Sequence, residues 1–184
     1  MSDLQNPASG AAAQAEAYVA ALMAALGSRE PMQVLAETPA TLRRAVAGLS
    51  PEQERTPEAA GKWSVKQVVQ HLADAELVGG FRYRMALTHD SPTLPGYDQD
   101  LWAERLRYQE SDLQAALNDF ATLRAANLRL LRAATPADMR RIVRHAERGD
   151  ESVEKMIRMF AGHDTVHLRQ IARIREAIGA PAAG

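Results

Sequence analysis

The chain has 184 residues, of which 46% are hydrophobic and 24% charged, and its 22 basic and 23 acidic residues give a formal net charge of −1. Such a chain is long enough for one globular domain with its own core, and its near-zero charge excludes a general attraction to nucleic acid or to an anionic membrane surface. Because cysteine is absent, disulfides, thiolate ligands and a catalytic thiol are excluded, so histidine and carboxylates must supply any metal site.

The N-terminus carries no targeting signal that we recognise. Residues 1–10 are polar and contain Pro7, so we expect a disordered N-terminus followed by a single domain over residues 11–180. No apolar run reaches the ~20 residues of a membrane-spanning helix, and the first residues lack the basic start and apolar core of a signal peptide. We therefore expect a cytoplasmic protein that does not insert into membranes.

The first third of the chain carries apolar residues at helical spacing. The alanine-rich residues 11–26 predict a short N-terminal helix, and a second helix is expected from residue 31 to about residue 49. Pro39 lies inside this second helix, where it should cause a kink or a break because proline cannot donate a backbone hydrogen bond. The polar residues 51–62 predict a loop.

Two capping boxes mark the starts of two longer helices. Residues 64–88 begin with Ser-Val-Lys-Gln and residues 111–134 with Ser-Asp-Leu-Gln, and in each the serine and the glutamine suit reciprocal capping. Between them, residues 89–100 contain many turn-forming residues and predict a loop, followed by an aromatic segment around Trp102.

Residues 137–151 are charged, and we interpret them as a surface connection with a short helical turn. Within them, Arg141-Ile-Val-Arg144 is too short and too charged to predict a β-strand. No other segment shows a convincing alternation of apolar and polar residues. The chain is therefore expected to be all-α, a four-helix bundle with an additional N-terminal helix.

The last predicted helix, residues 152–178, carries the strongest functional signal. Its apolar positions follow at steps of three and four residues, which should place them on a seam facing a helical core. In the middle of this seam stand Asp164 and His167, with His163 beside them. Two histidines four residues apart project from one face of a helix, so both imidazoles can bind one metal ion.

A metal site needs at least a third ligand, and His71 is the best candidate because it lies beside the apolar stripe of another long helix. The other histidines, His89 and His145, lie in segments predicted as loops. A site of His71, His163 and His167 would leave coordination positions open for water or substrate, as catalytic metal sites do.

Neighbouring polar residues could support these ligands. Asp74 and Asp164 could accept hydrogen bonds from the far ring nitrogens or from a bound water, and Gln170 could orient a ligand. The pattern His163-Asp-Thr-Val-His167 also resembles the zinc-protease signature HExxH, but aspartate is one methylene shorter than glutamate and no third histidine follows. The alternative interpretation is that the histidines are hydrogen-bonded residues of the core.

Other polar residues have simpler interpretations. Asn127 is expected to make a polar core contact, and Tyr97 and Trp102 to anchor a loop. The arginines within residues 124–132 and 140–148 are interpreted as solvated faces. Neither group has the interleaved aromatic residues of a nucleic-acid site.

Three blocks of the sequence occur in an order that is typical of one family. They are Trp63-Ser-Val-x-x-Val-x-x-His71-Leu-x-Asp74-x-Glu76, Tyr97-Asp-Gln-x-x-Trp102 and Gly162-His163-Asp164-x-x-His167-x-x-Gln170-Ile171. In these blocks the chain resembles the DinB-like superfamily, also described as YfiT-like metal-dependent hydrolases, over about residues 31–178. The helix at residues 11–26 departs from the simplest family pattern, and we assign it no role.

The resemblance implies a bundle whose pocket holds one divalent metal ion on three histidines, which correspond here to His71, His163 and His167. We expect Zn²⁺ or Ni²⁺, with Fe²⁺ and Mn²⁺ as alternatives, because imidazole accepts several divalent ions. The resemblance also implies a thiol S-transferase or hydrolase, a small-molecule substrate, a low-molecular-weight thiol as a partner, and a homodimer. The alternative is a non-catalytic metal-binding protein of stress response or dimerisation.

Overall fold

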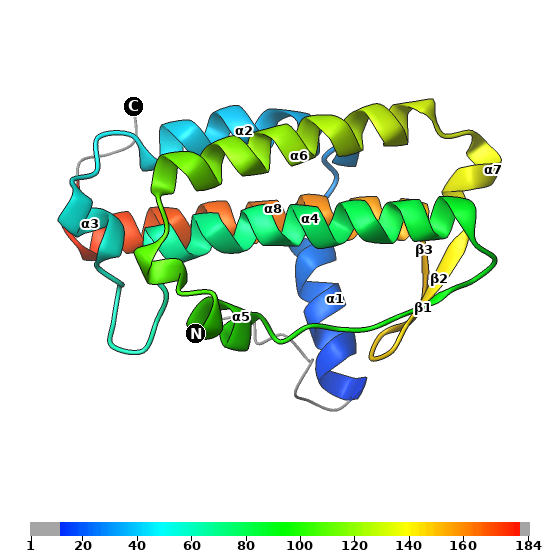
Figure 1. Cartoon of the computed structure of the whole chain (residues 1–184), viewed down its shortest axis with the longest axis horizontal. Helices are drawn as coiled ribbons and strands as arrows, with labels where there is room; N and C mark the ends of the chain where they lie inside the picture. The colour runs from blue at the N-terminus through cyan, green and yellow to red at the C-terminus, as the bar shows by residue number, and fades with distance from the viewer. Residues whose placement is uncertain (1–11, 181–184) are drawn as a thin grey trace.

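Four long helices run side by side along the molecule (Figure 1). In the computed structural model, which describes residues 12–180, they are α2 (Pro31–Val46), α4 (Val65–Thr88), α6 (Leu113–Ala133) and α8 (Val153–Ala177). Helices α4 and α2 each pack against both α6 and α8, so the predicted all-α four-helix bundle is confirmed. The N-terminal segment 1–10, predicted to be disordered, lies outside the described residues.

Shorter elements fill the connections between the long helices. They are α1 (Ala12–Leu26), α3 (Pro51–Arg55), β1 (Thr93–Leu94), α5 (Gln99–Arg105), a 3-10 helix (Tyr108–Glu110), α7 (Pro136–Met139), β2 (Ile142–His145) and β3 (Gly149–Ser152). The residues predicted as a polar loop after the second helix therefore begin with a short helix, α3. Among the helices of the described residues, none is long and apolar enough to cross a membrane.

A three-stranded sheet corrects the prediction that the chain has no β-strand. Strands β2 and β3 form an antiparallel hairpin, and β1 pairs with β2 in parallel. In β2 the side chains of Val143 and His145 are buried while Arg144 between them is exposed, which is the alternation of a half-buried strand. The strand is short and charged, but pairing on both sides satisfies its backbone, as in the bond from Arg144 N to Pro92 O (2.9 Å).

Pro39 lies inside α2, yet it does not break the helix. Proline has no N–H to donate to the carbonyl four residues earlier, which here belongs to Leu35. That carbonyl instead accepts a hydrogen bond from Arg124 Nη1 of α6 at 2.8 Å. A neighbouring helix therefore replaces the hydrogen bond that the proline removes.

The predicted capping box of Ser64 and Gln67 is present at the start of α4. The second predicted capping box is wrong, because the residue that caps α6 is Asp112 and not Ser111. The side chain of Asp112 accepts a hydrogen bond from Ala115 N at 2.7 Å. The hydroxyl of Ser111 instead donates to the carbonyl of Tyr108, the first residue of the 3-10 helix.

Helix α1 leaves the direction of the bundle and packs on α8 (Figure 1). The two backbones approach most closely at Gly162, where an added side-chain carbon would collide with the carbonyl oxygen of Leu22. Glycine is therefore required there for α1 to rest on α8.

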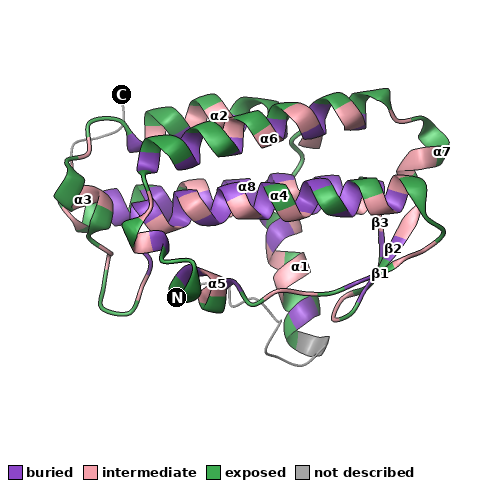
Figure 2. Cartoon of the chain, in the orientation of Figure 1, coloured by how far each residue is buried: buried purple, intermediate pink, exposed green. Residues whose placement is uncertain are grey.

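Two clusters of buried apolar side chains fill the bundle. One contains Trp63 and Ile171, and the other contains Tyr83 and Ala161. Helix α8 is buried along most of its length (Figure 2), and its polar residues between Ala161 and Ile171 separate the two clusters. The candidate site lies in this buried polar layer.

Candidate metal centre

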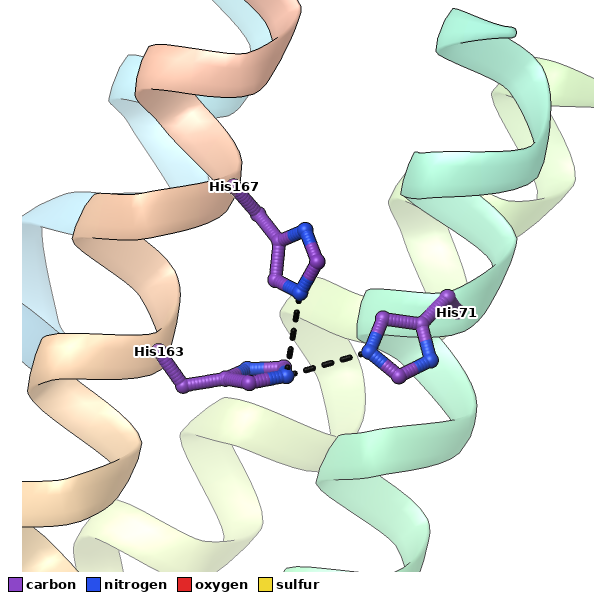
Figure 3. A group of neighbouring side chains, drawn as sticks. All are labelled: His71, His163 and His167. Atoms are coloured by element: carbon purple, nitrogen blue, oxygen red, sulfur yellow. Dashed lines mark hydrogen bonds between the residues drawn. The ribbon is translucent and has the colours of Figure 1, made fainter. Parts of the chain in front are cut away.

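Helices α4 and α8 bring the three predicted histidines together inside the bundle (Figure 3). The Nε2 atom of His163 lies 3.0 Å from Nε2 of His71 and 3.1 Å from Nε2 of His167. All three side chains are buried, and their potential ligand atoms lie within 4.8 Å of one another. The spacing of four residues on α8 places two of the rings one helical turn apart, and α4 presents the third ring to them.

The three imidazoles are neutral. Burial lowers the pKa of His71 and of His163 well below the ordinary value, and the nearby ring of His167 lowers both further. Burial also lowers the pKa of His167 to about 4, although the hydrogen bond with Gln170 and the charge of Asp164 act in the opposite direction. Neutral imidazole is the form that binds metal ions, so no proton has to be removed near pH 7.

A hydrogen bond of the His167 ring directs the lone pair of its Nε2 atom at the centre of the cluster. The Oε1 atom of Gln170 lies 2.8 Å from Nδ1 of His167, and because an amide oxygen only accepts, Nδ1 carries the proton and Nε2 does not. A proton on Nε2 of His163 could form a hydrogen bond with Nε2 of His71 or with Nε2 of His167, but not with both. The Nδ1 atoms of His71 and His163 are buried without a hydrogen-bond partner.

This donor set fits a divalent cation. Tetrahedral zinc with Zn–N bonds of about 2.0–2.1 Å implies nitrogen–nitrogen separations of about 3.3 Å, close to the measured 3.0 and 3.1 Å. Within the described residues, no fourth histidine or carboxylate joins the group. The arrangement can therefore bind one ion through three nitrogens and leave a position open.

Asp164 contacts Arg124 rather than a ring nitrogen, which was one of the two partners predicted for it. Its two carboxylate oxygens accept from Arg124 at 2.7 and 3.1 Å, and Arg124 also forms an ion pair with Glu76 at 2.8 Å. Arg124 is only 2% exposed, so its assignment to a solvated face is wrong. Its position on α6 lies beside the apolar seam, and two buried carboxylates offset its charge.

Asp74 also has another partner than the one predicted. It accepts a hydrogen bond from the hydroxyl of Tyr108 at 2.5 Å and lies 3.4 Å from the amide nitrogen of Gln70. Of the three residues predicted to support the ligands, only Gln170 contacts a histidine of the cluster. Asn127, by contrast, makes the predicted polar core contact, donating to the side chain of Glu76 at 2.9 Å.

A small cavity of about 50 Å³ opens beside the cluster, at His163. Its walls come from α1, α4, α8, the segment after β1, the start of α5, and the hairpin. They are formed by Tyr18, Leu22, Ala75, Val78, Arg82, Gly96, Tyr97, Gln99, His145, Arg148, Met159, Phe160 and His163. No motif in the sequence indicates Tyr18, Arg82 and Arg148 as site residues, because they lie far apart along the chain.

His145 lies in β2 rather than in a loop, with its Nε2 atom 3.2 Å from Arg82 Nη2. Burial, and then the charges of Arg148 and Arg82, lower the pKa of His145 from 6.5 to about 4. Between pH 6.5 and about pH 4, His145 therefore binds a proton in the unfolded chain but not in the folded chain. The stability that neutral His145 contributes is fully present above pH 6.5 and is lost as the pH falls toward 4.

We expect His145→Gln to flatten the pH dependence of folding stability. Between pH 6.5 and 4, the wild type should lose on the order of 2–3 kcal/mol more of its free energy of unfolding than the variant, which has no proton to bind. Urea unfolding at several pH values would measure both curves. Two parallel curves would contradict the expectation, whatever the offset between them.

Comparison with known proteins gives a consistent result. A family model described as the DinB superfamily matches residues 35–171, which begin after α1. A "putative metal-dependent hydrolase" of Oceanobacillus iheyensis is 33% identical over 138 residues, covering 75% of this chain and 80% of the relative. The protein of the same description from Bacillus subtilis, YfiT, is 30% identical over 149 residues, covering 80% of this chain and 84% of the relative.

The comparison with solved structures also finds YfiT of Bacillus subtilis, described as "a probable metal-dependent hydrolase with an unusual four-helix bundle topology". The two structures align with a TM-score of 0.78 at 29% identity, over 82% of this chain and 87% of that chain. The bundle, including the helices that carry the three histidines, is therefore similar to a known fold.

Proposed function

This chain belongs to the DinB superfamily, and from that premise we propose that it is a metal-dependent enzyme acting on a small molecule, with His71, His163 and His167 as the metal ligands. The observation that carries the proposal is the convergence of three neutral imidazoles, one of which, His163, lines a pocket. The names of its relatives, which describe metal-dependent hydrolases, support it.

A divalent ion held there would lower the pKa of a bound water or thiol and so supply a nucleophile near neutral pH. The chain's own residues provide the remaining conditions. Gln170 fixes the tautomer and the orientation of the His167 ring. The bundle excludes bulk water from the buried rings, and the pocket leads to His163.

We propose that the nucleophile is a low-molecular-weight thiol that is transferred to an electrophilic small molecule, with hydrolysis as the competing reaction. Zn²⁺ or Ni²⁺ is the proposed ion, since three imidazoles suit both, and Fe²⁺ or Mn²⁺ are the alternatives. Three protein ligands are typical of catalytic zinc sites, whereas structural sites usually have four. This difference favours an enzyme over a protein with a structural metal.

The test uses protein purified without an affinity tag, loaded with Zn²⁺ or Ni²⁺, and mixed with glutathione or N-acetylcysteine and a panel of electrophiles and esters. Mass spectrometry would follow thiol adducts and hydrolysis products separately. We expect turnover that a chelator lowers at least tenfold and that added metal restores. Stoichiometric metal without turnover would indicate a non-catalytic metal-binding protein, and failure to bind metal would indicate core histidines.

We also propose that the chain forms a homodimer through an apolar face on α4 and α5. Leu77 and Phe81, one turn apart on α4, are 54% and 55% exposed, and Leu101 of α5 is 46% exposed. Leu77 and Phe81 line a groove that also includes Trp102 of α5. Exposed apolar surface of this kind is typical of sites that another protein covers.

Placing a charge on this face should separate the protomers. We expect Phe81→Lys to halve the molar mass measured by light scattering, because a buried lysine without a partner opposes association. Ala125→Lys, at an exposed position of α6, should leave the mass unchanged. A wild type that is monomeric at all concentrations would contradict the proposal.

A further inference from the structure

The wall of the pocket next to His163 carries two buried guanidinium groups. Arg82 comes from α4 and is 7% exposed, and Arg148 comes from the turn between β2 and β3, with a side chain that is 8% exposed. Both line the same cavity as His163. Charged groups in such positions normally have partners of opposite charge.

Arg148 has such a partner. Its Nε and Nη2 atoms lie 2.6 and 3.0 Å from the two carboxylate oxygens of Glu151, whose side chain is 1% exposed. This two-point ion pair offsets the charge of one guanidinium within the fold.

Arg82 has only neutral partners among the described residues. Its Nη2 atom donates to the backbone oxygen of Pro95 at 3.1 Å and lies 3.2 Å from Nε2 of His145. Burial and then the charge of Arg148 lower the pKa of Arg82, although Tyr97, Glu151 and Tyr18 act in the opposite direction, so on balance its surroundings disfavour its charge. Glu147 lies beside Gly96, and its Oε2 atom is buried without a hydrogen-bond partner, but Glu147 is not one of the residues that line the pocket.

The pocket is therefore lined by two guanidinium cations, and of these two only Arg148 forms an ion pair with a carboxylate among the described residues. A buried cation without an opposite charge is costly, and the cost is removed when an anion binds beside it. The cavity of about 50 Å³ has room for the equivalent of about three to five water molecules, since each needs ~10–15 Å³. A carboxylate is an anion of this size.

We propose that this pocket binds a carboxylate of the substrate or of the thiol, with Arg82 as its main charge partner, so that the ligand of the metal site is a small carboxylate-bearing molecule. The inference rests on the proposed function for the role of His163, but the anion site itself stands on Arg82 and Arg148. It also gives α1 a role, since Tyr18 and Leu22 of this helix form part of the pocket wall.

The experiment compares two probes that differ at one group, N-acetylcysteine and its uncharged methyl ester, by isothermal titration into zinc-loaded protein. The wild type should bind the carboxylate at least tenfold more tightly than the ester, because a charge-assisted hydrogen bond to a buried group is lost in the ester. Arg82→Met should reduce this preference to less than twofold without changing the metal content. Arg129→Met, an exposed arginine of α6, should retain it.

Two further measurements separate this proposal from the metal site. N-acetylalanine, which has no thiol, should bind chelator-treated wild type more tightly than chelator-treated Arg82→Met, and Arg82→Lys should restore part of the difference. Zinc-loaded wild type that binds acid and ester equally would overturn the carboxylate pocket and leave the metal site intact. A preference for the acid in protein that never binds metal would support the pocket and overturn the proposed function.

Discussion

Replacing His167 with alanine is expected to abolish stoichiometric metal binding. The wild type should hold about one divalent ion per chain, and His167→Ala less than a tenth of that after dialysis. Loss of a residue that merely orients a ligand lowers metal affinity about 10–100-fold, so loss of a ligand should lower it by at least ~100-fold. Inductively coupled plasma mass spectrometry of untagged protein would measure the content.

The matched control is His89→Ala, because His89 is an exposed histidine at the end of α4 and lies outside the cluster. It should bind metal like the wild type. Gln170→Leu should fall between the two, since it keeps three imidazoles but removes the acceptor for His167 Nδ1. Equal metal in wild type and His167→Ala would exclude the three-histidine site.

Stability provides a second measure of the same site. A metal that binds only the folded chain stabilises it by RT ln(1 + [M]/Kd), about 2.7 kcal/mol at a free metal concentration 100 times Kd. Chelation should therefore lower the melting temperature of the wild type and leave that of His167→Ala unchanged. If chelation has no effect on the wild type, the histidines act as core residues.

The three histidines of the cluster could be identified from the sequence because their signals are local. The spacing of His163 and His167 fixes their common face on one helix, and His71 lies beside the apolar stripe of another. Buried polar residues in an apolar seam are costly without partners, so their presence in the middle of α8 already indicated a site. The helices themselves were predicted from the same periodicity.

The surroundings of the site could not be predicted because they depend on contacts distant in sequence. Asp164 was expected to face a histidine, but Arg124 of α6 reaches it across the bundle. The strand at Val143 forms because β1 and β3 pair with it on both sides. The pocket joins Tyr18 of α1 to Arg148 of the hairpin, and no local pattern in either segment indicates that they meet.

Removing Arg124 is expected to have the largest effect on stability. Its guanidinium pairs with Glu76 at 2.8 Å and with Asp164 at 2.7 Å, and all three side chains are at most 4% exposed. Burial alone would lower the pKa of Arg124, but the two carboxylates outweigh it and raise that pKa. Arg124→Met would leave two buried carboxylates without a cation, which typically costs about 3–5 kcal/mol.

The same substitution also removes the donor to Leu35 O, the carbonyl that Pro39 leaves without a helical partner. Urea unfolding should therefore show a loss of at least ~3 kcal/mol, and the melting temperature should fall by roughly 6–20 °C. Arg132→Met, at an exposed position on the same helix, should change the free energy of unfolding by less than about 0.5 kcal/mol.

A rescue experiment identifies the cause of the loss. Adding Glu76→Gln and Asp164→Asn to Arg124→Met removes the two unpaired charges, so the triple variant should be more stable than Arg124→Met alone. If the single variant loses less than about 1 kcal/mol, the ion pairs contribute little. Because neither carboxylate bonds to a histidine ring, the triple variant should still bind one metal ion. The charges that stabilise the bundle would then be separable from the imidazoles that form its site.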